Sequence, residues 1–184
     1  MDLNKIEEEI KKIILKSYVK TDLAHAISTR KWVLKLKPDS SLALQLSAFS
    51  HDIERGVYGK IDETKIIDYE KFKAVHSKRS AEIVKEILEK NYCDKEFIRQ
   101  VEYLILNHEF GGNDEANILA DADSLSFFEE NLEQYFEKYG LKVTEEKIKF
   151  MINRMSPKSR RFLKKIDIGD QTIKKIFENL ININ

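Results

Sequence analysis

The sequence has few residues that break or cross-link a chain: one cysteine, two prolines and six glycines in 184 residues. Because Cys93 has no partner within the chain, an intramolecular disulfide is excluded and a reducing compartment is expected. We expect Cys93 to be packed between helices rather than to act as a nucleophile. The scarcity of proline and glycine favours long helices over short strands and turns.

The sequence also lacks an excess of charge and any long apolar run. Its 32 basic residues equal its 32 acidic residues, so net charge does not favour a nucleic-acid or membrane partner. No segment approaches the roughly 20 apolar residues that span a bilayer. The N-terminus has no basic region followed by an apolar stretch. We therefore expect a soluble, cytoplasmic protein, of an oligomeric state that the sequence does not indicate.

What the sequence does contain is helical periodicity. Apolar residues make up 42% of the chain and charged residues 35%, which is typical of a globular protein. Helices are expected at residues 6–14, 22–36, 42–53, 69–90, 94–108, 117–140 and 144–155, and from 156 and 170 onward. Asp22 is a plausible N-cap, and residues 55–68 are expected to form a loop. With no linker or repeat, the pattern predicts one all-α domain over residues 1–184.

The chain has only four histidines, and each lies near the end of a predicted helix or beside the central apolar helix at 42–53. Three aspartates lie in similar surroundings. The candidate metal ligands are His25, His51, Asp52, His76, His108, Asp121 and Asp123.

Imidazole and carboxylate together suit divalent manganese, iron, cobalt, nickel or zinc. Burying an unpaired aspartate is costly, and a bound cation removes that cost. Neighbouring His51 and Asp52 point about 100° apart on a regular helix. They share one ion most easily where a helix ends, which is where they are predicted to lie. A single histidine is more often a core or surface residue than a ligand, so only the set as a whole indicates a metal site.

The order and contexts of these residues resemble the HD-domain superfamily of metal-dependent phosphohydrolases. The segments that carry the resemblance are LSAFSHDI at 46–53, HSKRSAEI at 76–83, ILNH at 105–108 and ILAD at 118–121. The resemblance covers roughly residues 20–140 and is nearest to small bacterial or archaeal HD hydrolases. It implies an HD-type helical bundle, with residues 141–184 as a C-terminal helical extension.

The resemblance implies that one divalent ion is held by His25, His51, Asp52 and Asp121. His76 and His108 match the additional histidines of members that hold two ions, with Asp52 bridging them. Asp121 fits the family's Leu-Ala-Asp context better than Asp123. We therefore expect Asp123 to be a catalytic or supporting group, or a charge favoured near a helix N-terminus.

The implied activity is hydrolysis of a nucleotide or another small phosphoester by metal-activated water. Asp52, Glu54 and Asp123 are the catalytic candidates. Glu54 either positions the water and moves its proton or is merely a loop acid. Phosphate oxygens also need cationic donors. The candidates are Arg55, Lys78 and Arg79, with Arg30 and Lys31 weaker.

Three alternatives stay open. The basic stretch at 153–161 is either a lid over a phosphorylated substrate or, as we favour, a capped helix junction with solvated charges. A di-iron oxygenase is an alternative activity, because some HD-fold members bind two irons through a similar set of histidines. A non-catalytic metal-binding sensor domain is the third, although a complete set of ligands argues against it.

Overall fold

The computed structural model describes residues 2–59 and 68–183, and within these ranges the regular structure is entirely helical. The elements are α1 Leu3–Ile14, α2 Asp22–Leu36, α3 Leu42–Ser50, α4 Arg55–Tyr58, α5 Tyr69–Lys90, α6 Lys95–Asn107, α7 Asp114–Ser126, a π-helical turn Phe127–Asn131, α8 Leu132–Arg154, α9 Pro157–Arg160, a 3₁₀ turn Leu163–Lys165 and α10 Gln171–Ile183. The all-α prediction is confirmed.

Capping residues begin several helices where the sequence predicts. Ser41, Asp94 and Asp170 each accept hydrogen bonds from backbone amides of the following turn. The predicted cap at Asp22 is wrong. Thr21 occupies the N-cap position of α2 without a side-chain bond. The buried Asp22 carboxylate instead accepts hydrogen bonds from Ser17 and Arg55.

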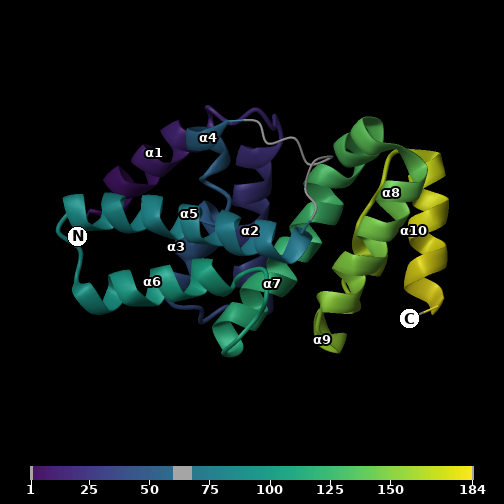
Figure 1. Ribbon diagram of the computed structural model, residues 1–184. Helices are drawn as coiled ribbons and strands as arrows, with labels where there is room; N and C mark the ends of the chain where they lie inside the picture. The colour runs from purple at the N-terminus through teal and green to yellow at the C-terminus, as the bar shows by residue number, and fades with distance from the viewer. Residues whose placement is uncertain (1, 60–67, 184) are drawn as a thin grey trace.

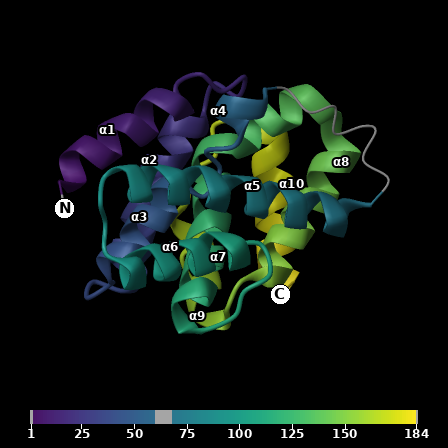
Figure 2. The ribbon, with the colours of Figure 1, turned by 60° about the vertical axis from the view of Figure 1, so that its left-hand side comes forward.

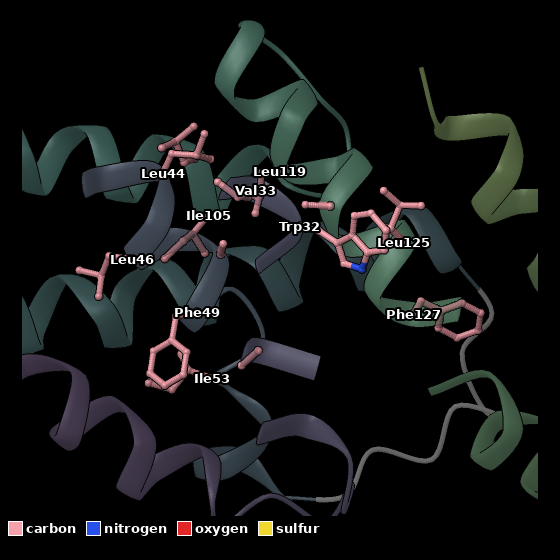
Figure 3. Close-up of a cluster of buried hydrophobic side chains, with 14 of the residues drawn as sticks. Trp32, Val33, Leu44, Leu46, Phe49, Ile53, Ile105, Leu119, Leu125 and Phe127 are labelled. Atoms are coloured by element: carbon pink, nitrogen blue, oxygen red, sulfur yellow. The ribbon is translucent and has the colours of Figure 1, made fainter. Parts of the chain in front are cut away.

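Helix α3 lies at the centre of the N-terminal part, as its apolar composition predicts. It packs against α2, α6 and α7 (Figure 1). Leu44, Phe49 and Ile105 belong to the buried core that joins these helices (Figure 3). The fully buried Ser47 lets α6 approach closely, and its hydroxyl donates to the carbonyl of Val101 at 3.4 Å. Cys93 is also buried, as expected.

The C-terminal part of the chain adds α8 and α10, which pack against each other and lie to one side of the N-terminal helices in Figure 1, whereas α10 runs partly behind them in Figure 2. The sequence predicts a helix end at Gly140, and the backbone does leave helical geometry there, with φ 74° and ψ −179°. Thr144, the predicted start of the next helix, donates its hydroxyl to the Gly140 carbonyl at 2.8 Å. The second half of α8 can therefore take a direction of its own, toward α7.

The predicted loop at 55–68 is described only in part. Residues 55–58 form the single turn α4 rather than a loop, while residues 60–67 lie outside the described residues. Among the described helices, none is long and apolar enough to span a membrane.

The conformation of Gly140 yields a stability prediction. Its backbone angles are strained for any residue with a side chain, at a cost of about 1–3 kcal/mol. No atom of the described residues lies within 4 Å of an added Cβ, so the cost is conformational rather than steric. We expect Gly140→Ala to lower the free energy of unfolding by about that amount in urea titrations. The exposed Lys142→Ala in the same helix is the control, and an equal effect of the two changes would contradict the interpretation.

Candidate metal centre

Two histidines lie at helix ends, where their rings are fixed by the backbone. His51 is the C-cap of α3, and its Nδ1 donates to the Ala48 carbonyl at 3.0 Å. His108 is the C-cap of α6, and its Nδ1 donates to the Ile105 carbonyl at 2.7 Å. Because a carbonyl only accepts hydrogen bonds, Nδ1 must carry the proton in both rings. The Nε2 atom of each ring is left to face the cluster.

The other two histidines are fixed by side chains. Ser126 donates its hydroxyl to the His25 backbone carbonyl at 2.9 Å, so it can only accept from His25 Nδ1, at 2.8 Å. His76 Nδ1 donates to Glu54 Oε1 at 3.0 Å. In all four histidines Nδ1 therefore makes a hydrogen bond within the protein, as is common in histidines that bind a metal through the other ring nitrogen.

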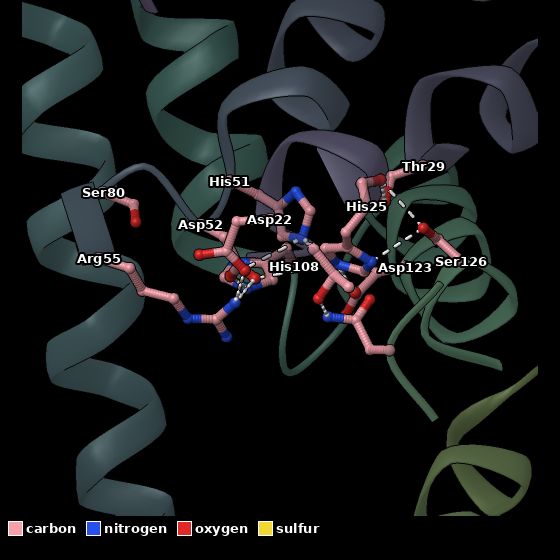
Figure 4. A network of polar contacts seen from close by, with 12 residues as sticks. Asp22, His25, Thr29, His51, Asp52, Arg55, Ser80, His108, Asp123 and Ser126 are labelled. Carbon is pink, nitrogen blue, oxygen red and sulfur yellow. Dashed lines mark hydrogen bonds and ion pairs between the residues drawn. The ribbon is translucent and has the colours of Figure 1, made fainter. Parts of the chain in front are cut away.

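The Nε2 atoms of His25 and His51 converge with the carboxylate of Asp123 (Figure 4). The two nitrogens are 3.3 Å apart, and Asp123 Oδ1 lies 3.0 Å and 3.4 Å from them. Ligands bound to one ion at about 2.1 Å lie roughly 3.0–3.4 Å from one another. The observed spacings match that range, so the donor set fits a transition-metal ion.

Asp52 joins this group to a second one. Its Oδ2 lies 3.8 Å from His25 Nε2, and its Oδ1 lies 2.8 Å from His76 Nε2 and 4.0 Å from His108 Nε2. His25, His51 and Asp52 form one group that could hold a metal ion, and Asp52, His76 and His108 form another. The histidines and Asp52 that the sequence selects thus come together, with Asp52 between the two groups.

Two arginines set the charge state of the carboxylates. Burial opposes the charge of Asp52, but the Arg55 guanidinium holds the pKa of this carboxyl well below its usual range. Burial likewise opposes the charge of Asp123, and Arg154 holds its pKa well below the usual range. Both aspartates are therefore anionic near neutral pH, as metal ligands must be.

The two histidines of the second group differ in basicity. Burial disfavours the charge of His76, but its hydrogen bonds to Asp52 and Glu54 raise its pKa to about 9. Burial lowers the pKa of His108 to about 4. In the metal-free protein His76 therefore holds a proton between two carboxylates, and an incoming cation has to displace it.

The geometry reverses the predicted choice between the two aspartates of α7. Asp121 accepts hydrogen bonds from the Ser156 amide, the Ser156 hydroxyl and the Ser159 hydroxyl, at 2.7, 2.6 and 2.7 Å. Residues two apart on a helix point roughly 200° apart, so only one aspartate can face the histidines. That residue is Asp123, and Asp121 anchors the α8–α9 junction instead.

The predicted substrate-binding residues also separate. Arg55 lies in the cluster, with Nη1 at 2.5 Å from Asp52 Oδ2 and 3.0 Å from Asp22 Oδ1. Lys78 is mostly exposed and lies 3.7 Å from Glu82 on the outer face of α5, away from the site. Arg79 is partly exposed and reaches the edge of the site, where its Nη1 lies 3.8 Å from Glu54 Oε2.

Other predicted residues fall inside and outside the site. Glu54 is 1% exposed and belongs to the site rather than to a solvated loop. Arg30 pairs with Glu7 at 2.8 Å, outside the cluster, and Lys31 is exposed. The capped junction expected within 153–161 is present, because Ser156 caps α9. The expectation that the charges of this stretch are solvated is wrong for Arg154, whose side chain is only 11% exposed.

Sequence reasoning did not assign the roles of two charged residues here. Arg154, in the basic stretch, contacts Asp123 and lies 2.9 Å from Glu109. Glu109 Oε1 lies 3.8 Å from His108 Nε2. Its position directly after His108 was an available signal for Glu109. Nothing local in the sequence distinguishes Arg154 from the solvated cations around it.

A cavity of about 490 Å³ opens beside the cluster. Its lining combines site residues with aromatic and cationic side chains from the π-helical turn and α8. The site residues on its wall are Glu54, Arg55, His76 and Glu109. The cluster is thus reachable by a small molecule.

These features define a class: an all-helical protein with a buried histidine–aspartate cluster that could hold metal ions beside a cavity. The chain belongs to the family described as domain of unknown function DUF4202, whose model matches residues 3–176. No curated protein and no solved structure matches the chain.

The contrast between the two aspartates gives a direct test of the ligand set. We expect Asp123→Ala to lower the manganese content per chain, because it removes the carboxylate between His25 and His51. Asp121→Ala should keep the metal while lowering stability, because it removes three hydrogen bonds at the junction. Metal analysis after loading and dialysis, with thermal unfolding, measures both. Metal loss in Asp121→Ala alone would restore the original assignment.

Proposed function

We propose that this protein is an HD-type metal-dependent phosphohydrolase that acts on a nucleotide or another small phosphoester. The observation that carries the proposal is the pair of histidine groups that share Asp52, open to a cavity. The ions would be one or two of manganese, iron, cobalt, nickel or zinc, held by His25, His51, Asp123, Asp52, His76 and His108.

The charge around the cluster supports an anionic substrate. Five carboxylates surround it: Asp22, Asp52, Glu54, Glu109 and Asp123. Among the described residues, four cations lie near them: Arg55, Arg79, Lys147 and Arg154. This described part of the site has one more carboxylate than fixed cations, and two divalent ions would turn this into an excess of positive charge. Such a site attracts a phosphoester dianion.

Divalent ions in such sites lower the pKa of water and neutralise charge on phosphoryl oxygens. The chain's own residues supply the remaining functions. Glu54 Oε1 accepts a hydrogen bond from His76 Nδ1 and so keeps that ring oriented. Glu54 lines the cavity, and its Oε2 atom is buried with no hydrogen-bond partner among the described residues, while Arg79 Nη1 lies 3.8 Å from it. This oxygen can accept and hold a proton from water at the reacting group.

Arg55 supports the binding of phosphoryl oxygens. Its contacts with Asp22 and Asp52 both use Nη1, and a guanidinium has five N–H donors. The Nε and Nη2 donors of Arg55 are not used in these two contacts, and Arg55 lies on the cavity wall. Arg55 therefore fixes the outer oxygen of Asp52 and offers an anion-binding group at the same place.

The proposal is tested by phosphate release from a panel of phosphoesters under anaerobic conditions. We expect manganese-loaded protein to hydrolyse at least one ester, and His51→Ala and Asp52→Ala to reduce that activity at least about 100-fold with loss of metal. Lys78→Ala, which alters a surface side chain away from the site, is the matched control and should keep full activity.

Other results would favour other functions. Oxygen consumption by the iron-loaded protein without phosphate release would replace the proposal with a di-iron oxygenase. Bound metal with neither activity would favour a sensor domain. Unchanged metal content in both variants would contradict all three readings of the cluster.

A further inference from the structure

The balanced charge of the whole chain conceals a local excess of cations after α8. Residues 156–166 contain five basic residues and no acidic one. Arg160 is used within the fold, because its guanidinium donates to the carbonyls of Asn153 and Met155. The other four are exposed: Lys158, Arg161, Lys164 and Lys165. The first three of these recur every three residues through consecutive turns, which places them on one side of the segment.

A partly exposed aromatic ring, that of Phe162, lies among these cations. Arg161 Cζ lies 5.3 Å from its centroid and Lys165 Nζ lies 5.7 Å from it. Helix α2 adds Lys35, whose Nζ is 5.3 Å from the same centroid. The exposed Lys31 precedes Lys35 by four residues and so lies on the same face of α2. The exposed cations of the two segments are called the basic surface below: Lys31, Lys35, Lys158, Arg161, Lys164 and Lys165.

The basic surface is not neutralised by the part of the chain that the structure describes. None of its six cations forms an ion pair there. The carboxylates nearest to it in sequence, Asp39 and Asp167, pair with Lys37 and Lys174 instead. Like charges held close together repel one another, so a bound polyanion would stabilise the surface.

The composition of the basic surface favours a nucleic acid over a lipid surface. Proteins that bind single strands without sequence preference combine cations for the phosphates with aromatic side chains. Helices that bind an anionic membrane also expose large apolar side chains, which enter the bilayer. Within residues 156–166 no large apolar side chain is more than partly exposed. The pattern of cations around one aromatic ring therefore fits a single strand better.

We propose that the basic surface binds the phosphate backbone of a single-stranded nucleic acid. None of its six cations is among the residues that line the cavity beside the metal cluster. This binding site is therefore separate from the proposed phosphoester site and does not depend on it. Because phosphate contacts carry no sequence information, the binding is independent of base sequence.

The test is the fluorescence anisotropy of a labelled oligothymidylate titrated with the full chain, with and without manganese. Wild-type binding should persist without manganese and weaken with salt, with a slope of about −3 in log K against log salt if about four phosphates are contacted. The combined change Arg161→Gln, Lys164→Gln and Lys165→Gln should lower the affinity at least about tenfold at roughly 0.1 M salt and make the slope shallower by about 2.

The matched control removes the same charge from three exposed lysines in and just after α1, which lies far from α9 (Figures 1 and 2). Lys5→Gln, Lys12→Gln and Lys16→Gln together should leave the affinity and the slope nearly unchanged. Thermal unfolding confirms that each variant is folded. The single change Arg161→Gln, which should make the slope shallower by about 0.7, serves if the first combined variant does not fold.

Three results would overturn the inference: no binding by the wild-type chain at low salt, an equal loss in the two combined variants, or binding that requires manganese. The last of these would place the oligonucleotide at the metal cluster. Binding of phosphatidylserine vesicles or polyglutamate in place of oligothymidylate would also overturn it, and would assign the surface to a membrane or to an acidic protein.

Discussion

The hydrogen bond donated by the Nδ1 atom of each histidine is the constraint on which the site depends. His51 and His108 use the same local device: each follows a helix and donates to the carbonyl three residues earlier. Carbonyls in the last turn of a helix lack a partner within that helix, so they are ready acceptors. The fold thus turns two helix ends into two oriented ligands, and Ser126 and Glu54 orient the other two rings.

Each of the two central carboxylates, Asp52 and Asp123, is held by an arginine. Arg55 contacts the Oδ2 atom of Asp52, and Arg154 contacts the Oδ2 atom of Asp123, so that each Oδ1 atom faces histidines. The arginines are themselves fixed, Arg55 by Asp22 and Arg154 by Glu109. Because Arg154 comes from beyond the break at Gly140, the C-terminal part of the chain completes the cluster rather than merely covering it.

The parts predictable from sequence are those that depend on local signals. The ends of α5 and the stop at Gly140 follow from periodicity and caps, and the gathering of four histidines follows from their rarity and placement. The choice of Asp121 failed because sequence context alone does not show which side of α7 faces the histidines. Lys78 and Arg79 were chosen for nearness in sequence, whereas Arg154 reaches the site only through the packing of α8 against α7. Such long-range packing cannot be predicted from the residues that neighbour Arg154 in the sequence.

We expect the four Nε2 atoms to converge on metal ions at either side of Asp52. Anomalous diffraction from crystals of the manganese-loaded protein tests this arrangement directly. One anomalous peak should lie among His25, His51 and Asp123 and a second between His76 and His108, with Asp52 touching both. A peak bound to Asp121, or a metal-loaded crystal with no peak at the cluster, would contradict it.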